Sequence, residues 1–176
     1  MKICMVLVDC LRPDHLGCYG YRKNTSPNID RIASEGMVFK NVVSQCNWTY
    51  PSVYSMFTGR YPSTLQVAWF DQRVSEAFPV LPEMLAKKGF KTGIFSNLKI
   101  LLNREGFSSH FQESRHTLLQ DNAPKLIKEW LGSAKDSFLL FHTAEYIHEP
   151  YSAGKELVEK FLDDDTRKEA NLESKM

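Results

Sequence analysis

Two side chains, Asp9 and Thr49, stand where a sheet and a helix could use them for chemistry. Asp9 comes directly after the apolar run Ile3 to Val8, which we interpret as a buried first strand. Parallel α/β sheets bind their ligands beyond the carboxyl ends of the strands. Asp9 is therefore placed either to bind a metal ion or to cap a turn, and its position alone does not decide between the two.

Thr49 stands just before a predicted helix over 50–59, which has a proline near its start and a glycine at its end. The first N–H groups of a helix have no partner within the helix, and its N-terminus carries a partial positive charge. Both features favour an oxyanion at the Thr49 hydroxyl, which is then a candidate nucleophile. A plain helix cap is the other interpretation.

The composition is that of one ordinary globular domain. The 176 residues are 43% hydrophobic and carry a formal net charge of +1. This composition excludes collagen, a coiled coil and a wholly disordered chain. A net charge of +1 is too small to attract nucleic acid or a membrane surface. The apolar run before Asp9 is too short for a signal peptide or a membrane span. Cys4, Cys10, Cys18 and Cys46 are interpreted as reduced core thiols, so we expect a cytoplasmic location.

Predicted strands alternate with predicted helices along the chain. This pattern predicts an α/β/α layered fold with a mainly parallel sheet. The strands are expected at 3–8, 37–43, 91–95 and 138–141, and the helices at 27–35, 50–59, 81–88 and 124–131. We expect one catalytic domain over 1–153, followed by a charged helix or disordered tail over 154–176.

Three blocks of sequence resemble the sulfatase family of the alkaline-phosphatase superfamily. They are VDCLRPDHLGCYG at 8–20, TSPNIDRIASEGMVF at 25–39 and WTYPSVYSMFTGRYP at 48–62. Looser matches follow in the same order at 95–97, at 106–111 and from Phe138 through His142 to the segment 148–151. The stretch between His142 and His148 is one residue longer than is usual in relatives. The resemblance covers roughly residues 1 to 151 and implies an α/β fold of the sulfatase type.

The resemblance also implies a mechanism and its residues. A nucleophile that is bound to one divalent metal ion attacks the sulfur or phosphorus of an ester. Asp9 and Thr49 match the metal-binding positions, Thr49 matches the nucleophile, and His148 matches a histidine that contacts the ester and protonates its leaving oxygen. A loop histidine is the alternative for His148. The expected substrate contacts are Asn97, Arg60 and His142, with structural roles as the alternative for Asn97 and Arg60.

Two departures from the usual sulfatase affect the chemistry. Thr49 replaces the cysteine or serine that becomes formylglycine, and Val53 replaces an arginine, so no formylglycine is expected. Threonine nucleophiles resemble those of related phosphodiesterases and phosphoethanolamine or phosphoglycerol transferases. Cys10 stands where many sulfatases have a second aspartate, which makes calcium less favoured and manganese or zinc plausible.

The D-H-G or D-N-G motif that supplies the family's remaining metal ligands is absent from the sequence. We therefore expect the N-terminal part of a longer enzyme, a truncated product or a fragment. The expected substrate is a small-molecule, lipid or saccharide ester of sulfate or phosphate, without nucleic acid. The alternative is a non-catalytic remnant that acts only by binding a partner or an anion.

Overall fold

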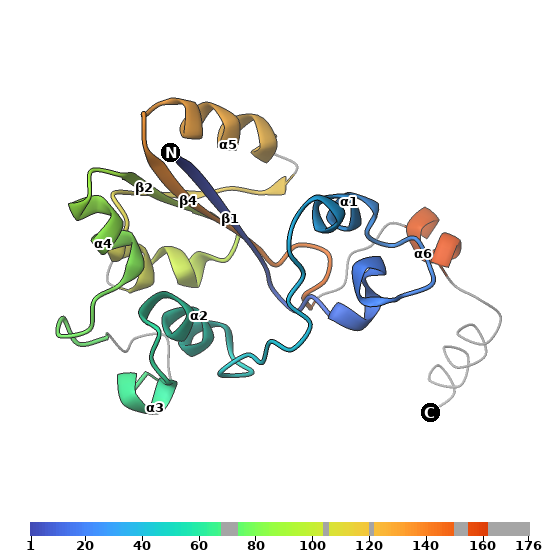
Figure 1. Ribbon diagram of the computed structural model, residues 1–176, viewed down its shortest axis with the longest axis horizontal. Coiled ribbons are helices and arrows are strands. Elements are labelled where there is room, and N and C mark those ends of the chain that lie inside the picture. Colours follow the sequence, from blue (N-terminus) through green and yellow to red (C-terminus); the bar gives the residue numbers. More distant parts are fainter. Residues whose placement is uncertain (68–73, 104–105, 120–121, 150–154, 162–176) are drawn as a thin grey trace. The chain divides into compact units, whose positions relative to one another are not determined.

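The computed structural model describes residues 1–67, 74–103, 106–119, 122–149 and 155–161 (Figure 1). The chain divides into two compact units. The first comprises Met1–Cys10 and Val42–Glu145, and the second comprises Leu11–Asn41 with the segment that begins at Tyr146. The predicted boundary at 153/154 lies outside the described residues.

The first unit is built on a four-stranded sheet in which every strand pair is parallel. Its strands are β1 (Lys2–Val8), β2 (Lys91–Ser96), β3 (Glu113–His116) and β4 (Ser137–Thr143), and their order is β1-β4-β2-β3. All seven residues of β4 are buried, which is why its sequence is a nearly continuous apolar run. The predicted α/β fold with a parallel sheet is thus confirmed.

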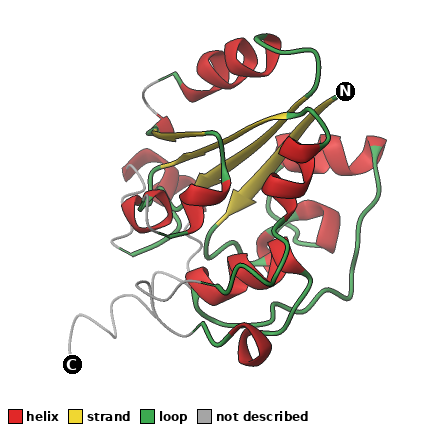
Figure 2. Cartoon of the chain, turned by 90° about the vertical axis from the view of Figure 1, so that its left-hand side faces the viewer, coloured by secondary structure: helices red, strands yellow, loops and turns green. Residues whose placement is uncertain are grey.

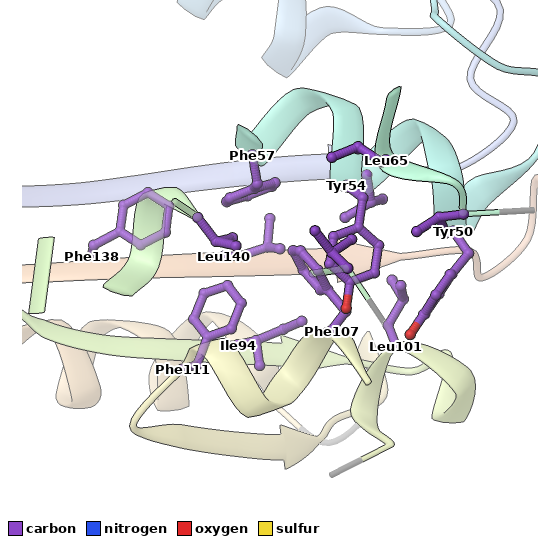
Figure 3. Packing of buried hydrophobic residues seen from close by; sticks show 14 residues of the cluster. Tyr50, Tyr54, Phe57, Leu65, Ile94, Leu101, Phe107, Phe111, Phe138 and Leu140 are labelled. Carbon is purple, nitrogen blue, oxygen red and sulfur yellow. The ribbon is translucent and has the colours of Figure 1, made fainter. Parts of the chain in front are cut away.

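Helices lie on both faces of this sheet (Figure 2). The helices of the first unit are α2 (Thr49–Thr58), α3 (Pro62–Leu65), α4 (Leu81–Lys87) and α5 (Ala123–Gly132), with the 3-10 turns η3 (Lys99–Leu102) and η4 (Phe107–His110). The larger core lies between α2 and one face of the sheet, where the rings of Tyr54, Phe57 and Phe107 pack edge to face (Figure 3). The smaller core lies under α5, where Trp130 packs on Phe95.

The second unit consists of short elements. They are the 3-10 turns η1 (Pro13–His15) and η2 (Gly17–Tyr19) and the helices α1 (Pro27–Glu35) and α6 (Lys155–Phe161). The Asp30 carboxylate organises the start of α1, because it accepts hydrogen bonds from the Cys18 N–H at 2.7 Å and from the Ser26 hydroxyl at 3.1 Å. The predicted helix over 27–35 is confirmed, with Pro27 at its first position and Gly36 after its end.

Two predictions about local structure are wrong. Residues 37–43 form no strand, and Met37, Phe39, Val42 and Val43 are exposed. An apolar, β-branched run becomes a strand only where another strand pairs with it, and this segment has no such partner among the described residues. The four cysteines are free but are not core residues, since Cys4 and Cys10 are exposed and Cys18 and Cys46 are half-buried.

Candidate active site

Asp9 lies at the carboxyl end of β1, where its backbone N–H donates to the Thr143 carbonyl oxygen at 2.9 Å. This bond continues the β1–β4 ladder by one residue and fixes the direction of the Asp9 side chain. Asp9 continues the row of Ile3, Met5 and Leu7, whose side chains pack against the larger core. Its side chain is 14% exposed. The carboxylate therefore sits at the sheet edge with one side toward the protein and one toward solvent.

Thr49 is the first residue of α2, one residue earlier in the helix than the sequence predicted. Trp48 before it is extended, and Pro51 stands in the first turn, where its missing N–H removes no helical hydrogen bond. The Thr49 hydroxyl donates a hydrogen bond of 2.9 Å to Asp9 Oδ2. The structure thus brings together the two residues that the sequence singled out as metal ligands.

His142 belongs to β4 and lies beneath Asp9 with its side chain 0% exposed. Its Nε2 is 3.5 Å from Asp9 Oδ2, and its Nδ1 is 2.9 Å from the Ser96 hydroxyl oxygen. The sequence predicted a substrate contact for His142. The ring as it lies here contacts Asp9 and Ser96 from inside the protein instead, and the predicted contact with substrate remains a prediction.

The His142 imidazole and the Thr49 hydroxyl stabilise the ionised Asp9 carboxylate. They lower its pKa to about 2, although partial burial alone would raise the pKa. Asp9 is therefore ionised at neutral pH, which is the state that a carboxylate needs in order to bind a cation.

Asn97 and Arg60 occupy very different places. Asn97 follows β2, and its side-chain oxygen accepts a hydrogen bond of 3.0 Å from the Ala144 N–H, so it ties the ends of β2 and β4 together. Arg60 is exposed and follows the C-terminal end of α2. A ten-residue helix is about 15 Å long, so the structure does not bring Arg60 to Thr49. Their substrate contacts remain predictions.

His148 lies in the second unit, where its Nδ1 is 2.7 Å from the Glu149 carbonyl oxygen. A carbonyl oxygen only accepts, so Nδ1 carries a proton in this contact. The ring is half-buried. The predicted role of His148 as a proton donor remains a prediction.

Cys10 has a backbone φ of 57°, which is unusual for a residue with a side chain. Its sulfur lies 3.6 Å from Asp9 Oδ1. Partial removal from water and the adjacent Asp9 carboxylate raise the pKa of the Cys10 thiol.

Asp9 and Thr49 provide two oxygen atoms that suit a divalent cation. Within the described ranges, no cluster of three or more His, Cys, Asp or Glu side chains is placed to hold a metal ion. The pair fits part of a coordination shell, and any further ligands must come from elsewhere. No helix in the same ranges is both long enough and apolar enough to cross a membrane.

Ser96 is the site residue that sequence reasoning did not identify as functional. It pairs with His142 in the β2–β4 register and is fully buried. Thr92, Ile94 and Ser96 form one row on β2, while Phe138, Leu140 and His142 form the matching row on β4. The signal that could have identified the pair is His142, a polar residue that ends the apolar row Phe138, Leu140 on a buried strand.

A parallel α/β sheet with a carboxylate at one strand end, joined to a hydroxyl at a helix N-terminus, has the architecture of the sulfatase-like folds. The sequence model of the Sulfatase family matches residues 2–173, and the chain belongs to that family.

Individual relatives match smaller parts of the chain. The chain is 39% identical to iduronate 2-sulfatase of Mus musculus over 95 residues, which cover 52% of this chain and 17% of that enzyme. The phosphonate monoester hydrolase of Agrobacterium radiobacter has a similar structure, with a TM-score of 0.71 and 15% identity over 92% of this chain and 44% of that one. The C-terminal periplasmic domain of EcEptC from Escherichia coli, in complex with zinc, has a TM-score of 0.68 and 19% identity over 93% and 50% of the two chains. The chain therefore spans only a part of the proteins that it resembles.

Proposed function

We propose that this site cleaves or transfers sulfate or phosphate esters, with Thr49 as the nucleophile and Asp9 as a metal ligand. The proposal rests on the 2.9 Å hydrogen bond from the Thr49 hydroxyl to Asp9 at the carboxyl edge of the sheet. Family membership supports ester hydrolysis in general. The structural neighbours include a phosphonate monoester hydrolase, which supports phosphorus chemistry alongside sulfate.

Asp9 and Thr49 would hold one divalent metal ion, with manganese, zinc or calcium as candidates. When bound, the ion supplies charge neutralisation on the transferred group and lowers the pKa of the Thr49 hydroxyl. The neighbour that was solved with zinc supports a metal in this fold. The ionised state of Asp9 suits this role, because its pKa is about 2.

Thr49 Oγ1 attacks the phosphorus or sulfur of the ester. A bond forms between this oxygen and the phosphorus or sulfur, and the bond to the leaving oxygen breaks. The Thr49 proton passes to solvent, and the leaving alcohol takes up a proton from a general acid, the role that the sequence resemblance gives to His148. Water or an acceptor alcohol then displaces Thr49 from the covalent intermediate. Because the Thr49 hydroxyl is itself the nucleophile, this route needs no formylglycine.

The test uses the protein as its source makes it. Turnover of p-nitrophenyl phosphate, bis-p-nitrophenyl phosphate and p-nitrophenyl sulfate is measured with manganese, zinc or calcium, for the wild type and for Thr49→Ala. The expected result is turnover of one ester class that Thr49→Ala abolishes, with a phosphoryl or sulfuryl adduct found on Thr49 by mass spectrometry. Unchanged turnover in Thr49→Ala would remove Thr49 as the nucleophile.

A second candidate function is a non-catalytic module that binds a partner or an anion. One observation favours it, namely that Asp9 and Thr49 supply only two ligand atoms and the described ranges contain no larger ligand cluster. The discriminating result is metal binding measured by calorimetry. Identical behaviour of wild type and Asp9→Asn, with no turnover, would favour the binding module over the enzyme.

A further inference from the structure

The Asp9 carboxylate is held from inside the protein by a pair of buried polar side chains. Ser96 and His142 are both fully buried, and they come from the neighbouring strands β2 and β4. The Ser96 hydroxyl lies 2.9 Å from His142 Nδ1. On the other side of the ring, Nε2 faces Asp9 Oδ2 at 3.5 Å and makes no hydrogen bond to any described residue. Buried polar atoms normally have hydrogen-bond partners, so the unpaired Nε2 beside Asp9 calls for a functional explanation.

The hydrogen bonds around Ser96 determine where the imidazole proton lies. The Ser96 oxygen accepts a hydrogen bond of 3.0 Å from the Leu98 N–H, and among the described residues His142 Nδ1 is the one acceptor within reach of its own O–H. A buried O–H needs an acceptor, so Ser96 donates to Nδ1. A neutral ring whose Nδ1 accepts carries its proton on Nε2. The Nε2–H then lies on the side of the ring that faces the negative Asp9 carboxylate, 3.5 Å from Oδ2, whereas the other tautomer would place a lone pair there.

The two Asp9 oxygens are thereby assigned different tasks. Oδ2 accepts the Thr49 hydroxyl hydrogen and faces the His142 ring, while Oδ1 has only the 3.6 Å contact with the Cys10 sulfur among the described residues. A carboxylate held on one oxygen cannot rotate without losing both of those contacts. Oδ1 therefore remains available for a cation.

We propose that Ser96 and His142 are positioning residues for the Thr49 reaction: Ser96 holds His142 in its Nε2–H tautomer, and His142 fixes the Asp9 carboxylate toward Thr49. This inference rests on the function proposed above and adds two residues to it. Both residues lie at the carboxyl end of the two inner strands of the sheet, where each is paired with a neighbouring strand on both sides, so the sheet holds their positions. Such supporting contacts around metal ligands are commonly as important as the ligands themselves.

The test that needs neither metal nor substrate is the tautomer of His142, read from the ¹⁵N chemical shifts of its ring, with the signal assigned through His142→Gln. We expect Nε2–H in the wild type, a change of tautomer in Ser96→Ala, and a return to the wild-type pattern in Ser96→Thr. Ser108→Ala is the matched control, because Ser108 is also buried but donates to the Asn103 carbonyl oxygen. It should leave the His142 signal unchanged.

The second measurement is steady-state kinetics of the same variants. Ser96→Ala should lower kcat about ten-fold with little change in KM, Ser96→Thr should restore it, and Ser108→Ala should have no effect. The proposal is overturned by an Nδ1–H tautomer in the wild type, by an unchanged tautomer in Ser96→Ala, or by a changed tautomer with unchanged kcat. These results are independent of the Thr49→Ala experiment, in which unchanged turnover would instead refute the nucleophile.

Discussion

The Thr49 hydroxyl and the Asp9 carboxylate, forty residues apart in the chain, are joined by a hydrogen bond of 2.9 Å. One residue begins a helix and the other ends a strand, so the bond connects α2 to the carboxyl edge of the sheet. The hydrogen of Thr49 points at Asp9, and the lone pairs of its oxygen therefore point elsewhere. This orientation is what a hydroxyl nucleophile requires.

Replacing the Thr49 hydroxyl should separate chemistry from stability. Thr49→Val keeps the shape of the side chain but removes its oxygen, and we expect turnover to fall on the order of 10³-fold or more. The loss of one partly exposed hydrogen bond should change the free energy of unfolding by only about 1 kcal/mol. Thr49→Ser should retain measurable turnover. The control is Thr58→Val at the other end of α2, whose hydroxyl makes local bonds, donating to the Tyr54 carbonyl oxygen and accepting from the Arg60 N–H.

Gly93 should tolerate no side chain. A Cβ at this position would lie 2.5 Å from Cζ2 of Trp130, whose indole is held by a 2.8 Å hydrogen bond to Glu113. We expect Gly93→Ala to lower the free energy of unfolding by about 1–3 kcal/mol in urea titrations. Gly132→Ala is the matched control, because a Cβ added there would meet no described atom within 4 Å apart from its chain neighbours and the backbone of its own helix. An equal loss in both variants would contradict the explanation by Trp130.

Because of Glu113, the free energy of unfolding should depend on pH in the acid range. Burial alone would raise its pKa, but the Trp130 N–H, Arg115 and Lys91 together lower it. A lowered pKa means that Glu113 stabilises the folded state above its ordinary pKa of about 4.3 and that this contribution is lost as the pH falls further. The difference in free energy of unfolding between wild type and Glu113→Gln should be about 1 kcal/mol at pH 7 and should shrink below about pH 4.

The control for this pH dependence is Glu129→Gln. Glu129 is 61% exposed and lies 3.9 Å from Lys125, so its removal should change stability little at any pH. A constant difference between wild type and Glu113→Gln from pH 7 to pH 3 would show that the charge of Glu113 is not what stabilises the fold.

Replacing Cys10 by a residue that tolerates a positive φ should stabilise the fold. Its φ of 57° is unfavourable for cysteine, and asparagine adopts this region more readily. We expect Cys10→Asn to raise the free energy of unfolding of the metal-free protein by about 0.5–1 kcal/mol. Cys46→Asn is the control, since Cys46 is not among the residues with positive φ. A loss of stability in Cys10→Asn would show that the contact of the sulfur with Asp9 matters more than the strain.

Local patterns predicted the elements well, and pairing between distant segments caused the errors. The apolar run before Asp9 and the buried run from Phe138 correspond to β1 and β4, because periodicity and hydrophobicity are properties of the segment itself. The strand Glu113–His116 was missed, because its polar sequence becomes a strand only through pairing with β2. The error at 37–43 is the reverse, because a strand was predicted there and the structure has none.

The site was predicted residue by residue but not as an arrangement. Asp9 and Thr49 could be selected from their positions at a strand end and a helix start, because each signal is local. Their contact could not, because it depends on where α2 packs against the sheet, and the burial of His142 could not, because it depends on which strands are neighbours. Ser96 was missed for the same reason, since its role follows from its register opposite His142.

The order of the strands has a consequence for how the site comes into being. β4, the last of the described strands in sequence, lies between β1 and β2, and β1 forms no pair with β2 directly. During synthesis, therefore, β1 and β2 must wait without their common neighbour until residues 137–143 have emerged. Such non-local pairing slows folding. Asp9 meets His142 only when β4 has inserted between β1 and β2, so the site forms after β4 is in place and not before.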